Sequence, residues 1–212
     1  MPAVLRGILR TMTAQVVDSA DVADSAVLGN GTKVWHLAQV RENAELGNEC
    51  IVGRGAYIGT GVSAGDNCKI QNYALVYEPA QLGHGVFVGP AAVFTNDHNP
   101  RAVNPDGSVK SATDWEPVGV HVGDGAAIGA RAVCVAPVTI GRWAMIAAGS
   151  VVTKDVPDFA LMAGVPARQL GWVGHSGLRL RAAGAGRWEC PETHRTYRET
   201  TTGLVPEVEE SS

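Results

Sequence analysis

An apolar residue recurs at every sixth position from Val16 to Phe94, and this period limits the possible folds more than any other feature of the chain. The residue two places before each of them is small, and glycine often follows directly after. A period of six fits neither an α-helix nor an alternating strand, but it fits a short strand followed by a tight turn. Three such units form one triangular coil, with the aliphatic side chains inside and glycine permitting the turns.

The predicted fold is therefore all-β: a left-handed parallel β-helix of hexapeptide repeats with one inserted loop and a short C-terminal helix and tail. Stacked coils bury a continuous column of aliphatic side chains, so a chain with 26 glycines and only 6% aromatic residues still has a core. The alternative, a sandwich of short strands, predicts irregular spacing instead.

The repeat also predicts the domain boundaries. It stops at Phe94 and resumes in a shifted phase at Val122, so a segment of about residues 95–118 is inserted. We expect the following parts: an N-terminal extension at 1–13, the β-helix at 14–157, an exit segment with a capping helix (169–181) at 158–181, and a partly ordered polar tail at 182–212.

Composition excludes several classes of function. The net charge of -4 disfavours nucleic acid as a partner. No apolar run approaches the roughly 18 residues that span a membrane, and the first ten residues do not form a secretory signal. We expect a cytoplasmic protein with its four cysteines reduced. The six histidines show no close ligand pair, so no metal site is expected and a zinc hydratase on this fold is disfavoured.

Residues 18 positions apart lie on successive coils, about 4.8 Å apart, so the sequence also predicts neighbours. Asn96, where the insertion begins, is predicted to lie over Glu78, and Thr95 over Tyr77. A carboxylate beside an amide at the base of an inserted loop suits a polar substrate. One outward column is predicted to contain His36, Arg54 and Asn72.

The first residues of the insertion carry the densest chemistry in the chain. Asn96, Asp97, His98 and Arg101 place an amide, a carboxylate, an imidazole and a guanidinium within six positions. His98 has the residue type of a general base near neutral pH, and Asp97 is suited to orient it or to hold an ammonium group. The same residue types also form turns, which is the structural alternative.

Several short motifs resemble one family of enzymes. They are Lys69–Asn72, Val76–Glu78, Phe94–Asn96, Asn99–Ala102, Asp155–Ala160 and Gly164–Trp172. Over about residues 14–180 the chain is similar to the hexapeptide-repeat nucleotide-sugar N-acetyltransferases. The nearest groups acetylate UDP-2-acetamido-3-amino-2,3-dideoxy-glucuronate or dTDP-3-amino-hexoses. The resemblance implies a homotrimer with active sites between neighbouring copies, acetyl-CoA along the later coils, and Asn96 near the reacting amine.

The resulting hypothesis is an acetyl-CoA-dependent N-acetyltransferase that acts on the amine, at C3, of a nucleotide-linked amino sugar. Asn96, with Glu78 or Asp97, holds the neutral amine against the acetyl carbonyl, and His98 is a proton acceptor or a substrate contact. The substrate-binding candidates are His36, Arg54, Asn72, Tyr77 and Arg101. A sugar O-acetyltransferase with His98 as general base is the main alternative, and a non-catalytic scaffold is another.

The later coils supply the candidates for the cofactor site. Small outward residues at Gly129, Gly141 and Ala147 would let a pantetheine arm lie against the β-helix. Lys154 and Arg168 would meet its phosphates. Further backbone hydrogen bonds are expected from Gly149 and Ser150.

Overall fold

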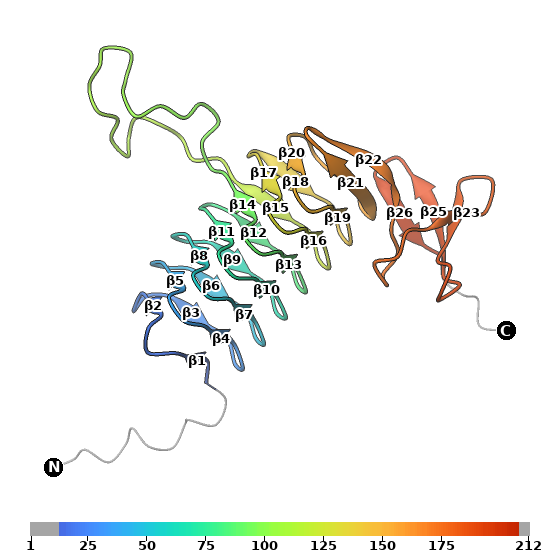
Figure 1. Ribbon diagram of the computed structural model, residues 1–212, viewed down its shortest axis with the longest axis horizontal. Helices are drawn as coiled ribbons and strands as arrows, with labels where there is room; N and C mark the ends of the chain where they lie inside the picture. The colour runs from blue at the N-terminus through green and yellow to red at the C-terminus, as the bar shows by residue number, and fades with distance from the viewer. Residues whose placement is uncertain (1–12, 208–212) are drawn as a thin grey trace.

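The computed structural model describes residues 13–207, and these form a long β-helix with a small sheet at its C-terminal end (Figure 1). The N-terminal extension predicted for residues 1–13 thus lies almost entirely outside the described residues. The left-handed parallel β-helix predicted from the six-residue period is confirmed, with three parallel sheets as the sides of a triangular prism.

Three sheets, here named A, B and C, build the prism. Sheet A contains β1 (Gln15–Val16), β4 (Lys33–Val34), β7 (Ile51–Val52), β10 (Lys69–Ile70), β13 (Phe87–Val88), β16 (Ala127–Ile128), β19 (Met145–Ile146), β21 (Ala160–Gly164) and β22 (Ala167–Trp172). Sheet B contains β2 (Asp21–Val22), β5 (Gln39–Val40), β8 (Tyr57–Ile58), β11 (Leu75–Val76), β14 (Val93–Phe94), β17 (Val133–Cys134) and β20 (Val151–Val152). Sheet C contains β3 (Val27–Leu28), β6 (Glu45–Leu46), β9 (Ser63–Ala64), β12 (Gln81–Leu82), β15 (Val120–Val122) and β18 (Val138–Ile140).

The strand register matches the predicted stacking of residues 18 positions apart. Leu75 pairs with Val93 and Tyr57 pairs with Leu75, so each residue lies beside its counterpart one coil later. The recurring aliphatic residue and the small residue two places before it both point inward: Val52 and Cys50 are almost fully buried. The thiols of Cys50 and Cys68 donate to the carbonyls of Gly65 and Gly83, so both cysteines serve as core residues.

The turns between sheets form three edges of the prism, which we name by the sheets they join. The AB corner has His36, Arg54, Asn72, Pro90, Ala130 and Ala148 at equivalent positions. The BC corner has Asp24, Glu42, Thr60, Glu78, Asn96, Ala136 and Lys154. The CA corner has Asn30, Asn48, Asp66, His84, Asp124 and Arg142.

Glycine at these corners meets two different needs, which corrects the expectation that it simply permits the turn. The residue directly after the inward aliphatic, such as Gly47, has ordinary φ, but a Cβ there would lie 2.7 Å from the backbone nitrogen of Asp66 on the next coil. The left-handed backbone occurs two residues later, at Gly31 and also at Glu49, where φ is 55°. The glycines that follow the aliphatic residues therefore let adjacent coils approach each other.

Side chains of the CA corner bond to the backbone of the preceding coil. Asn48 Oδ1 accepts from the N–H of Asn30, Asp66 Oδ1 from the N–H of Asn48, and Asp124 Oδ1 from the N–H of His84. Each bond satisfies a turn N–H that the sheets leave unpaired, so the ladder holds this edge together.

The insertion leaves the BC corner after β14 and returns at β15, as predicted. Its residues extend away from the prism (Figure 1). The coils on either side pair directly with each other, with Val93 opposite Val133 and Gln81 opposite His121. The prism is thus continuous across the insertion.

The C-terminal segment departs from the prediction. The helix expected at 169–181 is wrong: β21 and β22 form an antiparallel hairpin that extends sheet A, and no helix occurs among residues 13–207. The tail expected to be partly ordered folds into a four-stranded antiparallel sheet instead. Its strands are β23 (Arg181–Ala182), β24 (Arg187–Glu189), β25 (Thr196–Thr200) and β26 (Gly203–Pro206).

This small sheet closes the C-terminal end of the prism. Tyr197 and Leu204 are buried in the same apolar cluster as Phe159 and Leu180. The rings of Tyr197 and Phe159 lie 5.4 Å apart, and Asp158 bridges to Gly203. At the opposite end, among residues 13–207, the inward residue of the first coil, Val16, remains 43% exposed.

Candidate functional site

The base of the insertion brings together the residues predicted to carry chemistry. Pairing of β11 with β14 places Asn96 beside Glu78 on the BC corner, as the register predicts. The Asn96 carbonyl accepts a hydrogen bond from the N–H of Val118 at 2.9 Å, so the two arms of the insertion close against each other at this residue. Thr95 Oγ1 accepts from the N–H of Ala136 at 3.0 Å and ties the base to the next coil.

A pocket of about 330 Å³ opens directly beyond Asn96. It is lined by Asp97, His98, Asn99, Lys110, Asp114, Trp115, Glu116 and Val118. The Asp97 carboxylate accepts the N–H of Asn99 at 2.8 Å, so it shapes the turn as well as facing the pocket. The His98 side chain is exposed and lines this pocket.

Glu78 has an unusual carboxylate. Its Oε2 has no contact with solvent and no hydrogen-bond partner among the described residues. The carboxylate occupies the space above Gly59, where any Cβ would collide with it. An orphaned buried acceptor is costly, so this oxygen is suited to receive an N–H or ammonium donor when one is available.

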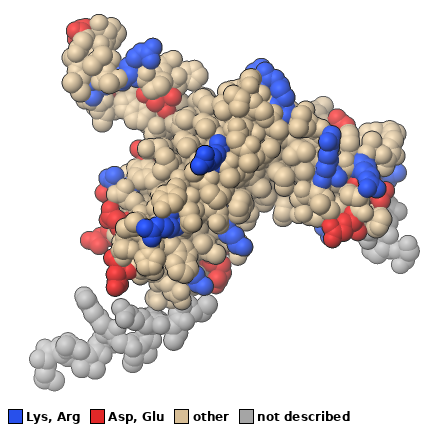
Figure 2. Space-filling view, viewed as in Figure 1, with Lys and Arg blue, Asp and Glu red and all other residues tan. Residues whose placement is uncertain are grey.

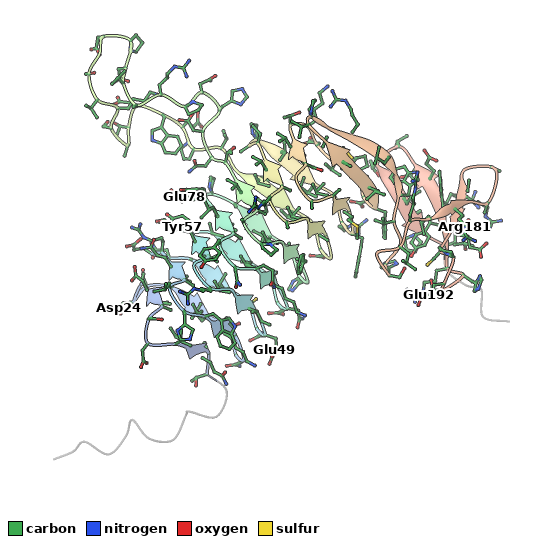
Figure 3. All side chains as sticks on the ribbon, viewed as in Figure 1. Asp24, Glu49, Tyr57, Glu78, Arg181 and Glu192 are labelled. Atoms are coloured by element: carbon green, nitrogen blue, oxygen red, sulfur yellow. The ribbon has the colours of Figure 1, made fainter. Side chains whose placement is uncertain are left out.

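Tyr57 is a member of this site that sequence analysis missed. Its ring lies 5.0 Å from the ring of Tyr77, and burial, followed by the charge of Glu78, raises the pKa of its hydroxyl. Figure 3 shows Tyr57 and Glu78 on the edge of the prism from which the insertion leaves. The available signal was its register: Tyr57 occupies the outward position of β8, one coil before the outward position of β11.

The predicted substrate column lies elsewhere. His36, Arg54 and Asn72 are on the AB corner, at the opposite edge of sheet B from Glu78 and Asn96. Asn72 and Glu78 are six positions apart along the chain, a path of at most about 20 Å. Within one chain the two sets therefore flank sheet B and do not converge.

Arg101 does not join the pocket in this structure. Its guanidinium donates to the carbonyl of Pro100 at 2.8 Å, and its side chain is exposed on the insertion.

The candidates for the cofactor site separate by corner. Gly129, Ala147 and Gly149 lie along the AB corner. Lys154 is exposed on the BC corner, two coils after Asn96. Gly141 is on the CA corner, where a Cβ would lie 2.7 Å from Asp158 Oδ1, so packing already explains this glycine. Arg168 is on β22, and its guanidinium donates a hydrogen bond to the carbonyl of Ala167.

Two of these candidates already use their donors inside the chain. The N–H of Gly149 bonds to Ala130 and that of Ser150 to Ala147. The buried Ser150 hydroxyl accepts the N–H of Gly164 and holds β21. These backbone donors are therefore not free for a pantetheine arm, whereas the α-carbon of Gly149 faces open space.

The outer surfaces of sheets B and C differ in character. Outward residues of the later strands of sheet B form a half-buried apolar stripe of Leu75, Val93, Val133 and Val151. Sheet C presents the polar residues Glu45, Ser63, Gln81, His121 and Thr139. Figure 2 shows acidic side chains gathered along the N-terminal coils and few charges over the later coils.

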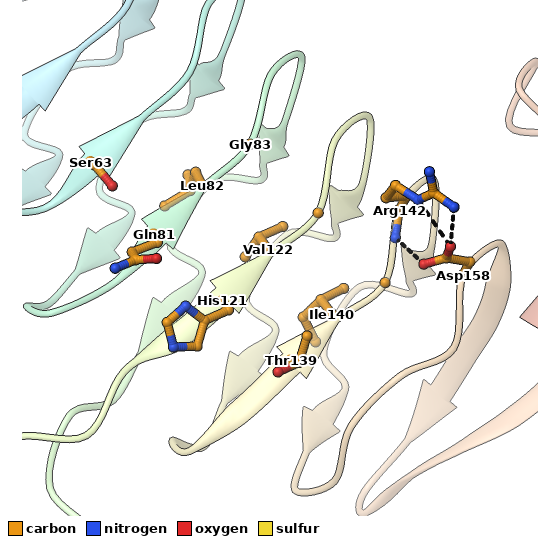
Figure 4. A pocket seen from close by; sticks show the side chains of 12 residues that line it. Ser63, Gln81, Leu82, Gly83, His121, Val122, Thr139, Ile140, Arg142 and Asp158 are labelled. Carbon is orange, nitrogen blue, oxygen red and sulfur yellow. Dashed lines mark hydrogen bonds and ion pairs between the residues drawn. The ribbon is translucent and has the colours of Figure 1, made fainter. Parts of the chain in front are cut away.

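A groove of about 430 Å³ follows sheet C near the CA corner (Figure 4). It is lined by polar side chains such as Gln81 and His121, and at one end Arg142 makes two bonds to Asp158 Oδ2 at 3.0 and 2.8 Å. None of the predicted catalytic residues lines this groove.

Across residues 13–207, no group of three His, Cys, Asp or Glu side chains is placed to hold a metal ion. The same part of the chain contains no helix of the length and hydropathy needed to cross a bilayer.

Two family models match the repeats. The model described as bacterial transferase hexapeptide (six repeats) matches residues 25–60, and the hexapeptide repeat of succinyl-transferase matches residues 118–154. Both matched segments lie within the coils described above.

Among curated proteins, the chain is 59% identical over 49 residues to dTDP-3-amino-3,6-dideoxy-alpha-D-galactopyranose 3-N-acetyltransferase from Aneurinibacillus thermoaerophilus. That alignment covers 23% of this chain and 26% of the relative. The chain thus matches about a quarter of that protein's length.

Two solved structures share the architecture. A hexapeptide-repeat acetyltransferase from Vibrio cholerae, complexed with acetyl coenzyme A, is 25% identical with a TM-score of 0.51, over 61% of this chain and 70% of its own. A UDP-N-acetylglucosamine acyltransferase from Bacteroides fragilis has a TM-score of 0.61 at 18% identity, over 76% of this chain and 61% of its own. The second likeness supports the fold alone.

Proposed function

We propose that this chain, which carries the hexapeptide repeats of bacterial transferases along its β-helix, is an acetyl-CoA-dependent N-acetyltransferase for the amine of a nucleotide-linked amino sugar. One observation carries the proposal: the single break in the repeat places Asn96 over the orphaned carboxylate of Glu78, beside a polar pocket that contains His98. The segment shared with an N-acetyltransferase of a dTDP-3-amino sugar supports the class of substrate and its C3 amine.

In the proposed reaction the neutral amine attacks the thioester carbonyl, so a C–N bond forms and the C–S bond breaks. The proton lost by the amine ends on the departing CoA sulfur, directly or through His98. Asn96 and Glu78 hold the amine by hydrogen bonds, which supplies the orientation that such a reaction needs most. Amines are good nucleophiles towards thioesters, so His98 contributes less than Asn96.

We further propose that the enzyme is a homotrimer with its sites between copies. The apolar stripe on sheet B is suited to face a three-fold axis, where it becomes buried. The AB corner of one copy then meets the BC corner of the next. This contact unites His36, Arg54 and Asn72 with Glu78 and Asn96, which one chain keeps apart.

The same contact provides a path for acetyl-CoA. Gly129, Ala147 and Gly149 on one copy would lie opposite Lys154 on the next, two coils beyond Asn96. The pantetheine arm would run along this edge towards Asn96, and Lys154 would meet its phosphates. A reducing, cytoplasmic setting is in keeping with four free, buried cysteines.

Turnover of variants tests the proposal. Purified protein is assayed for thiol release with acetyl-CoA and UDP- or dTDP-linked 3-amino sugars between pH 6 and 9. We expect Asn96→Ala to lose most activity at every pH and His98→Ala to lose a smaller part of it. Full activity in both variants would rule out this site, and preference for the corresponding hydroxyl sugar would favour O-acetylation instead.

A further inference from the structure

Arg54 on the AB corner is held by two consecutive residues of the next coil. Its backbone N–H donates to Asn72 Oδ1 at 2.8 Å, and its Nε donates to the Tyr73 hydroxyl at 3.2 Å. Asn72 therefore fixes the main chain of Arg54 while Tyr73 fixes its guanidinium. Both Arg54 and Tyr73 are exposed, so this arrangement does not serve the core.

Tyr73 adopts an unfavourable backbone conformation. Its φ is 60°, in the left-handed region that favours glycine or asparagine, and its side chain remains 55% exposed. The ring covers Gly55, where a Cβ would lie 2.6 Å from Cε1. Trp143 covers Gly125 in the same way on the CA corner, but it packs against His175 with ring centroids 4.6 Å apart. The distinctive partner of Tyr73 is the guanidinium of Arg54.

The terminal nitrogens of Arg54 have no counter-charge in the part of the chain that the structure describes. Within residues 13–207, no carboxylate lies at ion-pair distance from this side chain. A guanidinium held at Nε presents its remaining donors as a fixed fork, which matches the oxygens of a phosphate. The coil of Arg54 lies two steps of about 4.8 Å before the coil of Asn96. A hexose and its diphosphate span a comparable length.

We propose that Arg54 binds the diphosphate of the nucleotide-linked sugar and that Tyr73 is a positioning residue that aims its guanidinium. The inference rests on the proposed function, since acetyl transfer to a nucleotide-linked sugar supplies the diphosphate. It assigns Arg54 to the nucleotide sugar and not to the diphosphate of coenzyme A.

The test compares Tyr73→Phe, Arg54→Gln and the double variant. Calorimetry with UDP and dTDP gives binding without catalysis, and kinetics give separate KM values for nucleotide sugar and acetyl-CoA. We expect Arg54→Gln to weaken nucleoside diphosphate binding roughly tenfold or more and Tyr73→Phe roughly three- to tenfold. The double variant should resemble Arg54→Gln alone, because Tyr73 acts through Arg54. The KM for acetyl-CoA should not change.

Phenylalanine keeps the ring over Gly55, so Tyr73→Phe should keep the thermal stability of the wild type. Trp143→Phe is the matched control: it alters an aromatic residue at the equivalent turn position and should leave both KM values unchanged. Unchanged diphosphate binding in Tyr73→Phe, additive effects in the double variant, or a raised KM for acetyl-CoA alone would each overturn the inference. If the proposed function fails while this inference holds, no acetyl transfer occurs, but binding of UDP or dTDP still depends on Arg54.

Discussion

At the scale of single residues, the shape of the β-helix depends on how closely successive coils approach. All six residues that follow the inward aliphatics of sheet C are glycine: Gly29, Gly47, Gly65, Gly83, Gly123 and Gly141. At the same place after sheets A and B, side chains such as Gln71 and Tyr77 are accommodated. Backbone approach is therefore most restrictive along the CA corner.

Gly47→Ala should destabilise the protein by about 1–3 kcal/mol, because its Cβ would displace the backbone of Gly65 and Asp66. Denaturant unfolding monitored by circular dichroism measures the effect. Gln71→Ala, at the equivalent place after sheet A, is the control and should change stability by less than about 0.5 kcal/mol. Equal stability of Gly47→Ala and the wild type would contradict the close-approach explanation.

His175 couples the C-terminal sheet to the prism in a pH-dependent way. The Tyr197 hydroxyl accepts the His175 backbone N–H at 3.0 Å and lies 2.9 Å from its Nδ1, so it is placed to donate to a neutral ring. Burial against Trp143 and Phe159, and then the charge of Arg195, lower the pKa of His175.

Because its folded pKa is depressed, His175 binds a proton more readily in the unfolded chain. Stability from this group is therefore present above about pH 6.5 and is lost as the pH falls below it. The wild type should lose more thermal stability between pH 7.5 and 5.5 than His175→Asn, whose amide keeps an acceptor near Tyr197. Parallel pH profiles for the two proteins would show that His175 does not contribute.

At the scale of elements, the sequence predicts the strands that belong to the six-residue repeat and misses the strands that lie outside it. The strands, the coil of 18 residues and the place of the insertion all follow from one period, because inward and outward positions recur with it. Beyond Val152 the period ends, and antiparallel pairing decides the structure of 160–206. A helix was expected from Gln169 onward, but pairing with Met162 makes this residue part of a strand.

The same distinction applies to the candidate site. Stacking predicted that Asn96 lies beside Glu78, since both positions are fixed by register. It did not predict that Tyr73 bonds Arg54 or that Ser150 bonds Gly164, since those contacts depend on side-chain direction. Tyr57 was missed for a related reason: outward positions accept many residue types, so its identity alone gave no signal.

The insertion should be separable from the fold. Removal of residues 97–118 makes Phe94 and Val122 six residues apart and brings Gly119 to the turn position with left-handed backbone. The strands on both sides already pair, so this variant should fold with the same circular dichroism spectrum and no acetyltransferase activity. Retained activity would show that the chemistry lies outside the insertion, and an unfolded product would show that the insertion supports the coils.

At the scale of the whole molecule, the proposed assembly predicts complementation between inactive chains. Arg54→Glu and Asn96→Ala each disable one edge of the site. In a cyclic trimer, every mixed assembly contains one interface with Arg54 from one copy and Asn96 from the next. Equal co-expression should therefore restore about a quarter of wild-type activity. Activity no greater than the average of the two parents would mean that each chain holds its own site or that no trimer forms.

Because the coils are evenly spaced, the number of coils between two residues sets the length of substrate that the proposed site can accept. The distance along the axis between Arg54 and Asn96 consists of whole steps of about 4.8 Å, each contributed by 18 residues. Loss or gain of one coil between them would shorten or lengthen the site by one such step while leaving both ends intact. Selectivity for the length of the substrate would therefore change in fixed increments, by coil number, and not by gradual reshaping of a pocket.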